Sequence, residues 1–225
     1  MRFKNKTAIV TGAGSGIGQA VAIEASKEGA QVVIADVNLE KAKETLEEIL
    51  GMGGKAILIQ SDMSIKQDAE RLCMKAVEAF GGIDLLCYSA GIQTYGTVVS
   101  TDEDLWDQTL DVNLKGMYLV AKYCIPEMNK QGGGSIVNIS SVQGFVCQKN
   151  VAAYAASKGG AISLSRAMAL DHAKDNIRVN CICPGSIDTP MLKYGAGKHG
   201  NAEEVIKEWG QQHPLGRVGT PEEIA

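Results

Sequence analysis

Three tyrosines in this chain are each followed by a lysine four positions later. The pairs are Tyr118 and Lys122, Tyr154 and Lys158, and Tyr194 and Lys198. On a helix, residues four apart lie on the same face, so each pair could bring an ammonium group beside a phenol. A nearby positive charge lowers the pKa of a phenol from its reference value of about 10, which makes a proton donor and acceptor usable near neutral pH. The surroundings of each pair must decide which one does this chemistry.

A second stretch that could do chemistry is the glycine-rich TGAGSGIG, which follows a short apolar run. None of its glycines precedes a lysine, which excludes a P-loop, and Ile17 stands where G-x-G-x-x-G needs its third glycine. What remains is T-G-x-x-x-G-x-G, on Gly12, Gly16 and Gly18. Between a strand and a helix, such a turn lets the backbone approach a pyrophosphate, and the helix N-terminus binds it. The alternative is a plain glycine-rich turn.

An aspartate lies about twenty residues beyond these glycines, at the end of the next apolar run. The carboxylate of Asp36 would accept hydrogen bonds from adenosine ribose hydroxyls and repel a 2′-phosphate. The neighbouring Ser15 and Val37 offer no positive charge to hold such a phosphate, so the sequence predicts NAD rather than NADP. Asp62 and the segment SAG (89–91) also end apolar runs, and they would contact the adenine and the cofactor from the same sheet edge.

Only Tyr154 and Lys158 have the neighbours that this cofactor requires. Tyr194 lies in KYGAGKHGN, whose glycines argue against a stable helix, so that pair is not expected to stack. Tyr118 lies well inside a long helical segment, whereas Tyr154 lies near the start of the helix after SIVNISS. Ser141 ends that run and could donate a hydrogen bond to a substrate oxygen. The chain has three histidines, His172, His199 and His213. None of them lies at the end of a predicted strand, so a histidine is not favoured for the proton transfer.

Six apolar runs of strand length alternate with longer segments of helical periodicity. The runs span residues 7–12, 31–36, 55–62, 84–91, 134–141 and 177–185. Continuous apolar character is typical of strands buried on both faces, and the alternation predicts a mostly parallel, doubly wound sheet between helix layers. We expect a single α/β domain of three layers, α/β/α, over residues 1–225. A last helix opens with Thr220 as N-cap and Pro221 in its first position.

Together these motifs make the chain similar to the classical short-chain dehydrogenase/reductase (SDR) family. The matching pieces run in family order: TGAGSGIG, Asp36, Asp62, SAG, DVNLKG, SIVNISS, YAASK and IRVNCICPGSIDTP. The resemblance implies a Rossmann-like fold and a catalytic tetrad of Asn113, Ser141, Tyr154 and Lys158. In that tetrad Tyr154 would be the general acid/base, and Lys158 would hold the nicotinamide ribose and tune the tyrosine. Ser141 would orient the substrate oxygen, and Asn113 would anchor a water.

The resemblance also implies a bound NAD along the carboxyl edge of the sheet. The expected cofactor residues are Gly12, Ser15, Gly16, Ile17, Gly18, Asp36, Val37, Asp62, Met63, Ala90, Gly91, Tyr154, Lys158, Pro184, Gly185, Ile187 and Thr189. It implies a homodimer or homotetramer as well, formed through the helix that begins AAYAASKGGAIS and the long one before it. The sequence alone singles out neither Asn113 nor the subunit number.

Two departures from the family pattern stand out. Tyr88 and Ser89 replace two asparagines, the first of which helps to tie the central strands together, so local rigidity is expected to change more than chemistry. The sequence also stops at TPEEIA, before the last helix and strand that the family has. A truncated, inactive relative and a non-catalytic NAD-binding protein are therefore alternatives. The joint presence of the four tetrad residues favours the enzyme.

Substrate residues are expected near Ser141 and after Thr189. The candidates are Gln93, Ser141, Gln143, Gln148, Tyr154, Met191 and Tyr194. This mixed lining suits a small-molecule alcohol or ketone of modest size, including a hydroxylated one. Ordinary loop glutamines are the alternative.

Composition narrows the partners. The 225 residues carry a net charge of −4 without a basic cluster, which argues against nucleic acid. No apolar run has the length of a signal peptide or a membrane span, so we expect a cytoplasmic protein without a membrane partner. The six cysteines follow no metal-binding pattern, and the close pair Cys181 and Cys183 is interpreted as small buried hydrophobes.

Overall fold

The computed structural model describes residues 1–225 and contains one six-stranded parallel sheet. Its strands are β1 (Thr7–Thr11), β2 (Gln31–Asp36), β3 (Lys55–Gln60), β4 (Leu85–Tyr88), β5 (Gly134–Ile139) and β6 (Ile177–Ile182). They lie in the order β3-β2-β1-β4-β5-β6. The direction of winding therefore reverses between β1 and β4, the place where open α/β sheets bind ligands beyond their carboxyl ends. The predicted doubly wound sheet is confirmed.

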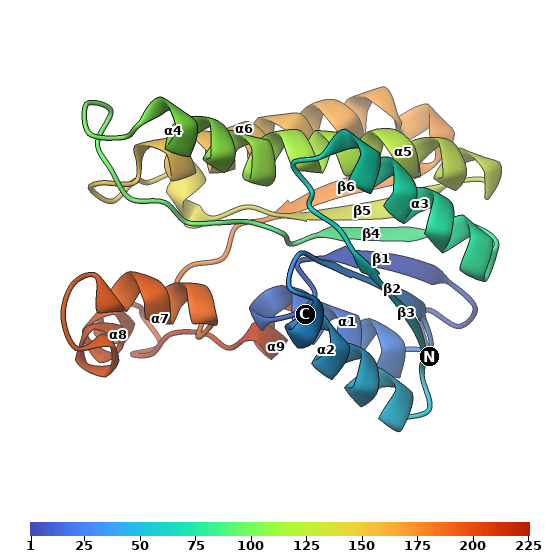
Figure 1. Cartoon of the computed structure of the whole chain (residues 1–225), viewed down its shortest axis with the longest axis horizontal. Coiled ribbons are helices and arrows are strands. Elements are labelled where there is room, and N and C mark those ends of the chain that lie inside the picture. The colour runs from blue at the N-terminus through green and yellow to red at the C-terminus, as the bar shows by residue number, and fades with distance from the viewer.

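Helices cover both faces of the sheet and make three layers (Figure 1). One layer holds α1 (Gly16–Lys27) and α2 (Leu39–Gly51); the other holds α3 (Lys66–Phe80), α4 (Glu103–Leu110), α5 (Gly116–Lys130) and α6 (Ala152–Asp171). The side chains of successive strand residues point to opposite faces of the pleated sheet and so pack against opposite helix layers. Ile9 and Val33 pack into the core under α3, α5 and α6, whereas Val10 and Ile34 pack into the core under α1 and α2.

The expectation that every strand is buried on both faces is wrong at the sheet edges. β3 is only half-buried, and in β6 Ile177 and Val179 are buried while Arg178 and Asn180 are exposed. An edge strand has a neighbour on one side only, so helices cover it less completely. Cys181 and Cys183 are accordingly half-buried rather than buried. No group of three or more histidine, cysteine, aspartate or glutamate side chains lies close enough to hold a metal ion.

Five of the six strands end sooner than the apolar runs that predicted them; β1 ends at Thr11 rather than at residue 12, and β3 at Gln60 rather than 62. β4 ends at Tyr88 rather than at residue 91, β5 at Ile139 rather than 141, and β6 at Ile182 rather than 185. The residues beyond each end turn away from the ladder, so Ser89, Ser141 and Pro184 line a cavity instead of pairing in the sheet. Most of the residues that were wrongly assigned to these strands are thus residues that form the site.

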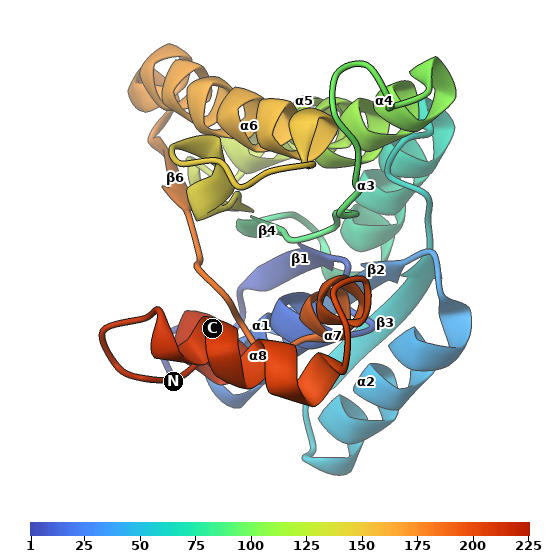
Figure 2. The same cartoon turned by 90° about the vertical axis from the view of Figure 1, so that its left-hand side faces the viewer.

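Three helices follow β6: α7 (Pro190–Gly197), α8 (Ala202–Gln211) and α9 (Pro221–Ile224). Figure 2 shows α7 and α8 together beside the carboxyl edge of the sheet. α7 overturns the prediction that the glycines around Tyr194 prevent a helix. Thr189 caps it by accepting the Leu192 N–H at 3.2 Å, and Pro190 occupies its first position. The predicted Thr220 cap of α9 is confirmed. No helix combines the length and apolar character needed to cross a membrane.

Candidate active site

A cavity of about 730 Å³ opens at the carboxyl edge of the sheet. The predicted residues that line it are Gly12, Ser15, Gly16, Ile17, Asp36, Val37, Asp62, Met63, Ala90, Gly91, Gln93, Ser141, Gln143, Gln148, Tyr154, Lys158, Pro184, Gly185, Ile187, Thr189 and Met191. Gly18 and Asn113 are buried behind its wall, and Tyr194 is 59% exposed and does not line it. Residues chosen from six strand ends therefore meet around one space.

The glycine turn brings the backbone of two strands together. Gly12 has φ +65°, and a Cβ there would lie 2.8 Å from the Ala90 Cα, so a larger residue would separate β1 from β4. A Cβ on Gly18 would collide with the Gly12 carbonyl, which means that Gly18 packs α1 against the turn and is not exposed to a ligand. At the start of α1, the N–H groups of Ile17 and Gly18 donate to no group of the chain, and no side chain caps the helix.

Asp36 is fixed at the end of β2 by two backbone donors. Its Oδ2 accepts the Gly14 N–H and its Oδ1 accepts the Asn38 N–H, both at 2.8 Å. Gly14 is a site residue that the sequence argument missed, since T-G-x-x-x-G-x-G leaves position 14 free. A Cβ there would lie 2.9 Å from the Asp36 Oδ2, so the absent side chain is what allows this hydrogen bond.

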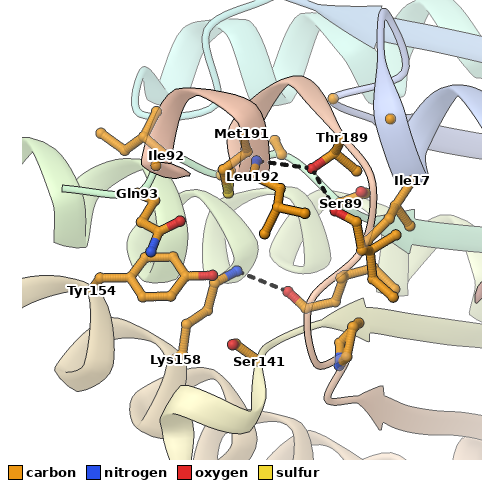
Figure 3. A pocket seen from close by; sticks show the side chains of 18 of the residues that line it. Ile17, Ser89, Ile92, Gln93, Ser141, Tyr154, Lys158, Thr189, Met191 and Leu192 are labelled. Atoms are coloured by element: carbon orange, nitrogen blue, oxygen red, sulfur yellow. Dashed lines mark hydrogen bonds between the residues drawn. The ribbon is translucent and has the colours of Figure 1, made fainter. Parts of the chain in front are cut away.

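All three tyrosine–lysine pairs stack. The lysine Nζ lies 5.7 Å from the Tyr118 ring centroid, 5.6 Å from that of Tyr154 and 4.8 Å from that of Tyr194. The expectation that the third pair does not stack is wrong, because α7 forms. Burial separates the pairs: Tyr154 is 7% exposed and Lys158 5%, whereas Tyr118 is 46% exposed and Tyr194 59%. Only the middle pair reaches the cavity (Figure 3).

Burial also sets the protonation of this pair. The Lys158 Nζ donates to the Ile139 carbonyl at 3.0 Å, and burial lowers the lysine pKa to about 8. Burial raises the pKa of the Tyr154 phenol above its ordinary value, although a hydrogen bond with Ser141 acts in the opposite direction. The predicted net lowering of the phenol pKa is therefore wrong for this structure, because burial raises this pKa above its ordinary value. Desolvation opposes the phenolate, and the Nζ is directed at a carbonyl instead.

Ser141 lies two residues past β5 and caps the short 3₁₀ turn Val142–Gly144. Its Oγ accepts the Gln143 N–H at 3.1 Å, which fixes the hydroxyl oxygen while its proton can reach Tyr154. In Figure 3, Ser141 faces the cavity from below the Tyr154 and Lys158 side chains. The serine, the phenol and the ammonium thus converge from two elements on one end of the cavity.

Asn113 is fully buried and holds the loop that follows β4. Its Oδ1 accepts the Ile92 N–H at 2.8 Å, and its Nδ2 donates to the Ile92 carbonyl at 2.9 Å and to the Ser157 Oγ at 3.0 Å. A Cβ on Gly91 would lie 3.3 Å from the Asn113 Oδ1 and 3.5 Å from the Lys158 Nζ. The amide and the ammonium therefore flank the same glycine.

Asn113 does not lie in a regular α-helix. It belongs to a π-helical segment, Asp111–Lys115, between α4 and α5. The Gly116 N–H donates to the Asp111 carbonyl, five residues back, which leaves the Val112 carbonyl without its usual helix donor. The Tyr88 hydroxyl, buried at the end of β4, donates to that carbonyl at 2.6 Å. Tyr88 thus ties a central strand to this segment.

Several lining residues have no motif that could have identified them. They are Tyr95, Gln108, Trp209, Gln212 and His213. Most come from segments whose structure was not predicted, above all α8 and the turn after it. His213 lies close to Gly185, where a Cβ would be 3.1 Å from its Cε1. A Cβ on Gly195 would collide with the Tyr95 hydroxyl, so α7 packs tightly over this end of the cavity.

Known proteins resemble this chain over nearly all of its length. A family model described as short chain dehydrogenase matches residues 6–199. An uncharacterized oxidoreductase of Thermotoga maritima is 42% identical over 225 residues, which are 100% of this chain and 89% of that protein. Cyclohexanol dehydrogenase of an Acinetobacter species is 38% identical, over 100% of this chain and 86% of that protein. The crystal structure of levodione reductase has a TM-score of 0.96 at 31% identity, covering 99% of this chain and 88% of that one.

Proposed function

This chain belongs to the short-chain dehydrogenase family, and we propose that it is an NAD-dependent oxidoreductase that interconverts an alcohol and a ketone. One observation carries the proposal. Tyr154, Lys158 and Ser141 converge at one end of a cavity whose other end is lined by the glycine turn and Asp36. A cofactor and a substrate placed end to end in this cavity would meet beside the phenol.

The far end of the cavity fits a dinucleotide. The free N–H group of Ile17 and the dipole of α1 would bind a pyrophosphate at the glycine turn. Asp36, oriented by its two backbone donors, would accept the ribose hydroxyls and disfavour a 2′-phosphate. When bound, the nicotinamide supplies or accepts the hydride.

Tyr154 would move the proton at its hydroxyl oxygen. Because burial raises the phenol pKa, Tyr154 holds its proton at neutral pH and can donate it to a carbonyl oxygen as that oxygen gains charge. Lys158, with a pKa of about 8, is largely protonated at pH 7 and would stabilise the phenolate that forms. Ser141 would hold the substrate oxygen beside the phenol. In the oxidative direction the same proton returns to Tyr154.

A non-catalytic NAD-binding protein is the weaker candidate. Such a protein would use the glycine turn and Asp36 alone. It would gain nothing from burying an ammonium group beside a phenol, and burial of a charge without a counter-ion is costly. Perturbed ionisable groups that line a cavity favour a catalytic role.

Replacement of Tyr154 by phenylalanine tests the proposal. Tyr154→Phe removes the proton and keeps the ring, so turnover of an alcohol panel that includes cyclohexanol should fall about 10²–10⁴-fold. NADH binding, followed by fluorescence, should be retained. Tyr118→Phe is the matched control, because Tyr118 stacks with its own lysine but is exposed and outside the cavity. Undiminished turnover by Tyr154→Phe would refute the assignment.

We also propose that the chain forms a homodimer or homotetramer, as its resemblance to the family implies, and that it works in the cytoplasm. The exposed apolar side chains of Tyr118 on α5 and Leu170 on α6 support an interface on these helices. Leu170 is 80% exposed, and contact with a second subunit would remove it from water.

A further inference from the structure

The end of the cavity around Tyr154 combines amide, hydroxyl and apolar side chains and carries almost no charge. The charged residues in the whole lining are Asp36, Asp62 and Lys158. Both aspartates lie at the dinucleotide end, and the Lys158 Nζ is already directed at the Ile139 carbonyl. In place of charge, the lining contains five glutamines: Gln93, Gln108, Gln143, Gln148 and Gln212.

These amides come from four different segments and are largely free to bind a ligand. Gln93 follows β4, Gln108 lies in α4, Gln143 and Gln148 follow β5, and Gln212 follows α8. The Gln143 Oε1 accepts the Gln148 N–H at 2.8 Å, which leaves the Gln143 amino group as a donor of fixed direction. Figure 3 shows the Gln93 amide beside Tyr154. A ligand here would meet donors and acceptors from several sides.

Aromatic rings complete this part of the wall. Tyr95 and Trp209 line the cavity, and the His199 ring lies between them. Its centroid is 6.4 Å from that of Tyr95 and 5.8 Å from that of Trp209, both in edge-on contact. Such an arrangement fixes two aromatic surfaces that can cover the C–H groups of a ring, while the amides bind groups at its rim.

We infer that the substrate is a neutral ring compound with at least two hydroxyl groups besides the reacting one, such as a free sugar or a cyclic polyol. The inference rests on the proposed function. A carboxylate or phosphate would lose its hydration, and the lining holds no lysine or arginine besides Lys158 to replace it. A simple alcohol would leave the half-buried amides of Gln93 and Gln143 without partners on binding, and unpaired polar groups reduce affinity. A polyhydroxylated ring satisfies both the amides and the aromatic surfaces.

A series of ring alcohols tests the inference. The probes are cyclohexanol, 1,2-cyclohexanediol, 1,2,3-cyclohexanetriol and 3-hydroxycyclohexanecarboxylate, each assayed with NAD⁺ and with NADP⁺. We expect kcat/KM to rise about 10-fold with each added hydroxyl and to be lowest for the carboxylate. Equal or better use of cyclohexanol, or a preference for the carboxylate, would overturn the inference and leave the proposed function standing. Oxidation of none of the probes, with neither nucleotide bound, would overturn both.

Variants of the amides give an independent readout. Gln93→Leu and Gln143→Leu should each lower kcat/KM for the triol about 10-fold more than for cyclohexanol. Gln67→Leu is the matched control, because Gln67 is exposed on α3 and does not line the cavity. It should change neither value. If the two cavity variants affect triol and cyclohexanol equally, the amides do not recognise hydroxyls and the inference is wrong.

Discussion

Lys158 is a charged residue that lies almost completely out of contact with water. It is 5% exposed, and the Ile139 carbonyl is the group to which it donates. Burial lowers its pKa from an ordinary 10.5 to about 8. At pH 7 the folded protein therefore keeps a desolvated positive charge, which costs stability. Such a cost is consistent with a charge that serves the chemistry beside Tyr154.

The cost predicts a pH-dependent effect of Lys158→Met. Without nucleotide at pH 7, the variant should exceed the wild type in free energy of unfolding by up to roughly 3 kcal/mol. Between about pH 8 and 10.5 the unfolded wild type binds a proton that its folded state does not, so wild-type stability rises and the difference shrinks. Denaturation in urea at pH 7, 8.5 and 10 measures it, with Lys122→Met, outside the cavity, as control. A pH-independent difference would contradict the lowered pKa.

At this scale the sequence could identify the residues but not their protonation. Spacing alone does not choose among the tyrosine–lysine pairs, since all three stack. The position of Tyr154 after a strand end did choose correctly which pair reaches the cavity. The raised pKa of Tyr154 was not predictable, because desolvation depends on what α6 packs against rather than on any neighbour in sequence.

Among the elements, the π-helical segment connects the fold to the site. In its register the Val112 carbonyl accepts a hydrogen bond from the Tyr88 hydroxyl. The next residue, Asn113, accepts one from the Ile92 N–H in the loop after β4. A Cβ on Gly116 would collide with that hydroxyl, so a glycine at the start of α5 makes room for it. Tyr88 stands where the family usually has an asparagine, and its hydrogen bond connects the end of β4 to the π-helical segment.

Tyr88→Phe should show what this tie contributes. The variant removes the hydroxyl donor from the part-buried Val112 carbonyl, which should cost about 0.5–1.5 kcal/mol of unfolding free energy. If the segment relaxes, kcat should fall while the KM for NADH changes little. Tyr123→Phe on α5 is the control, because the Tyr123 hydroxyl has no hydrogen bond in the structure and little should change. Equal effects of the two variants, measured by denaturation and steady-state kinetics, would argue against the tie.

Most strands and the helices between them could be predicted from apolar periodicity, but this segment and α7 could not. The π register depends on Tyr88, more than twenty residues earlier in the chain. α7 contains two glycines and depends on Thr189, Pro190 and the close approach of Gly195 to Tyr95. Both elements are stabilised by tertiary contacts that override local propensity.

For the molecule as a whole, the cavity joins parts of the chain that otherwise contact each other little. Its lining runs from Gly12 in the first loop to His213 beyond α8 and includes loops from both halves of the sheet. α7 and α8 pack chiefly against each other. A ligand that spans the cavity would therefore add contacts between the sheet and these helices, and it should stabilise the entire fold by mass action.

This linkage predicts different responses to the two nucleotides. NADH at 100 times its Kd should add about 3 kcal/mol and raise the melting temperature by roughly 5–10 °C, whereas the same concentration of NADPH should raise it much less. Asp36→Ala should bring the two shifts together, because it removes the carboxylate that disfavours a 2′-phosphate. Asp107→Ala, an exposed acid outside the cavity, should preserve the difference. Thermal scans with each nucleotide measure all three proteins. Equal shifts in the wild type would show that Asp36 does not select between the two nucleotides. The absence of a shift with either nucleotide would contradict the proposal that this chain binds a nicotinamide cofactor.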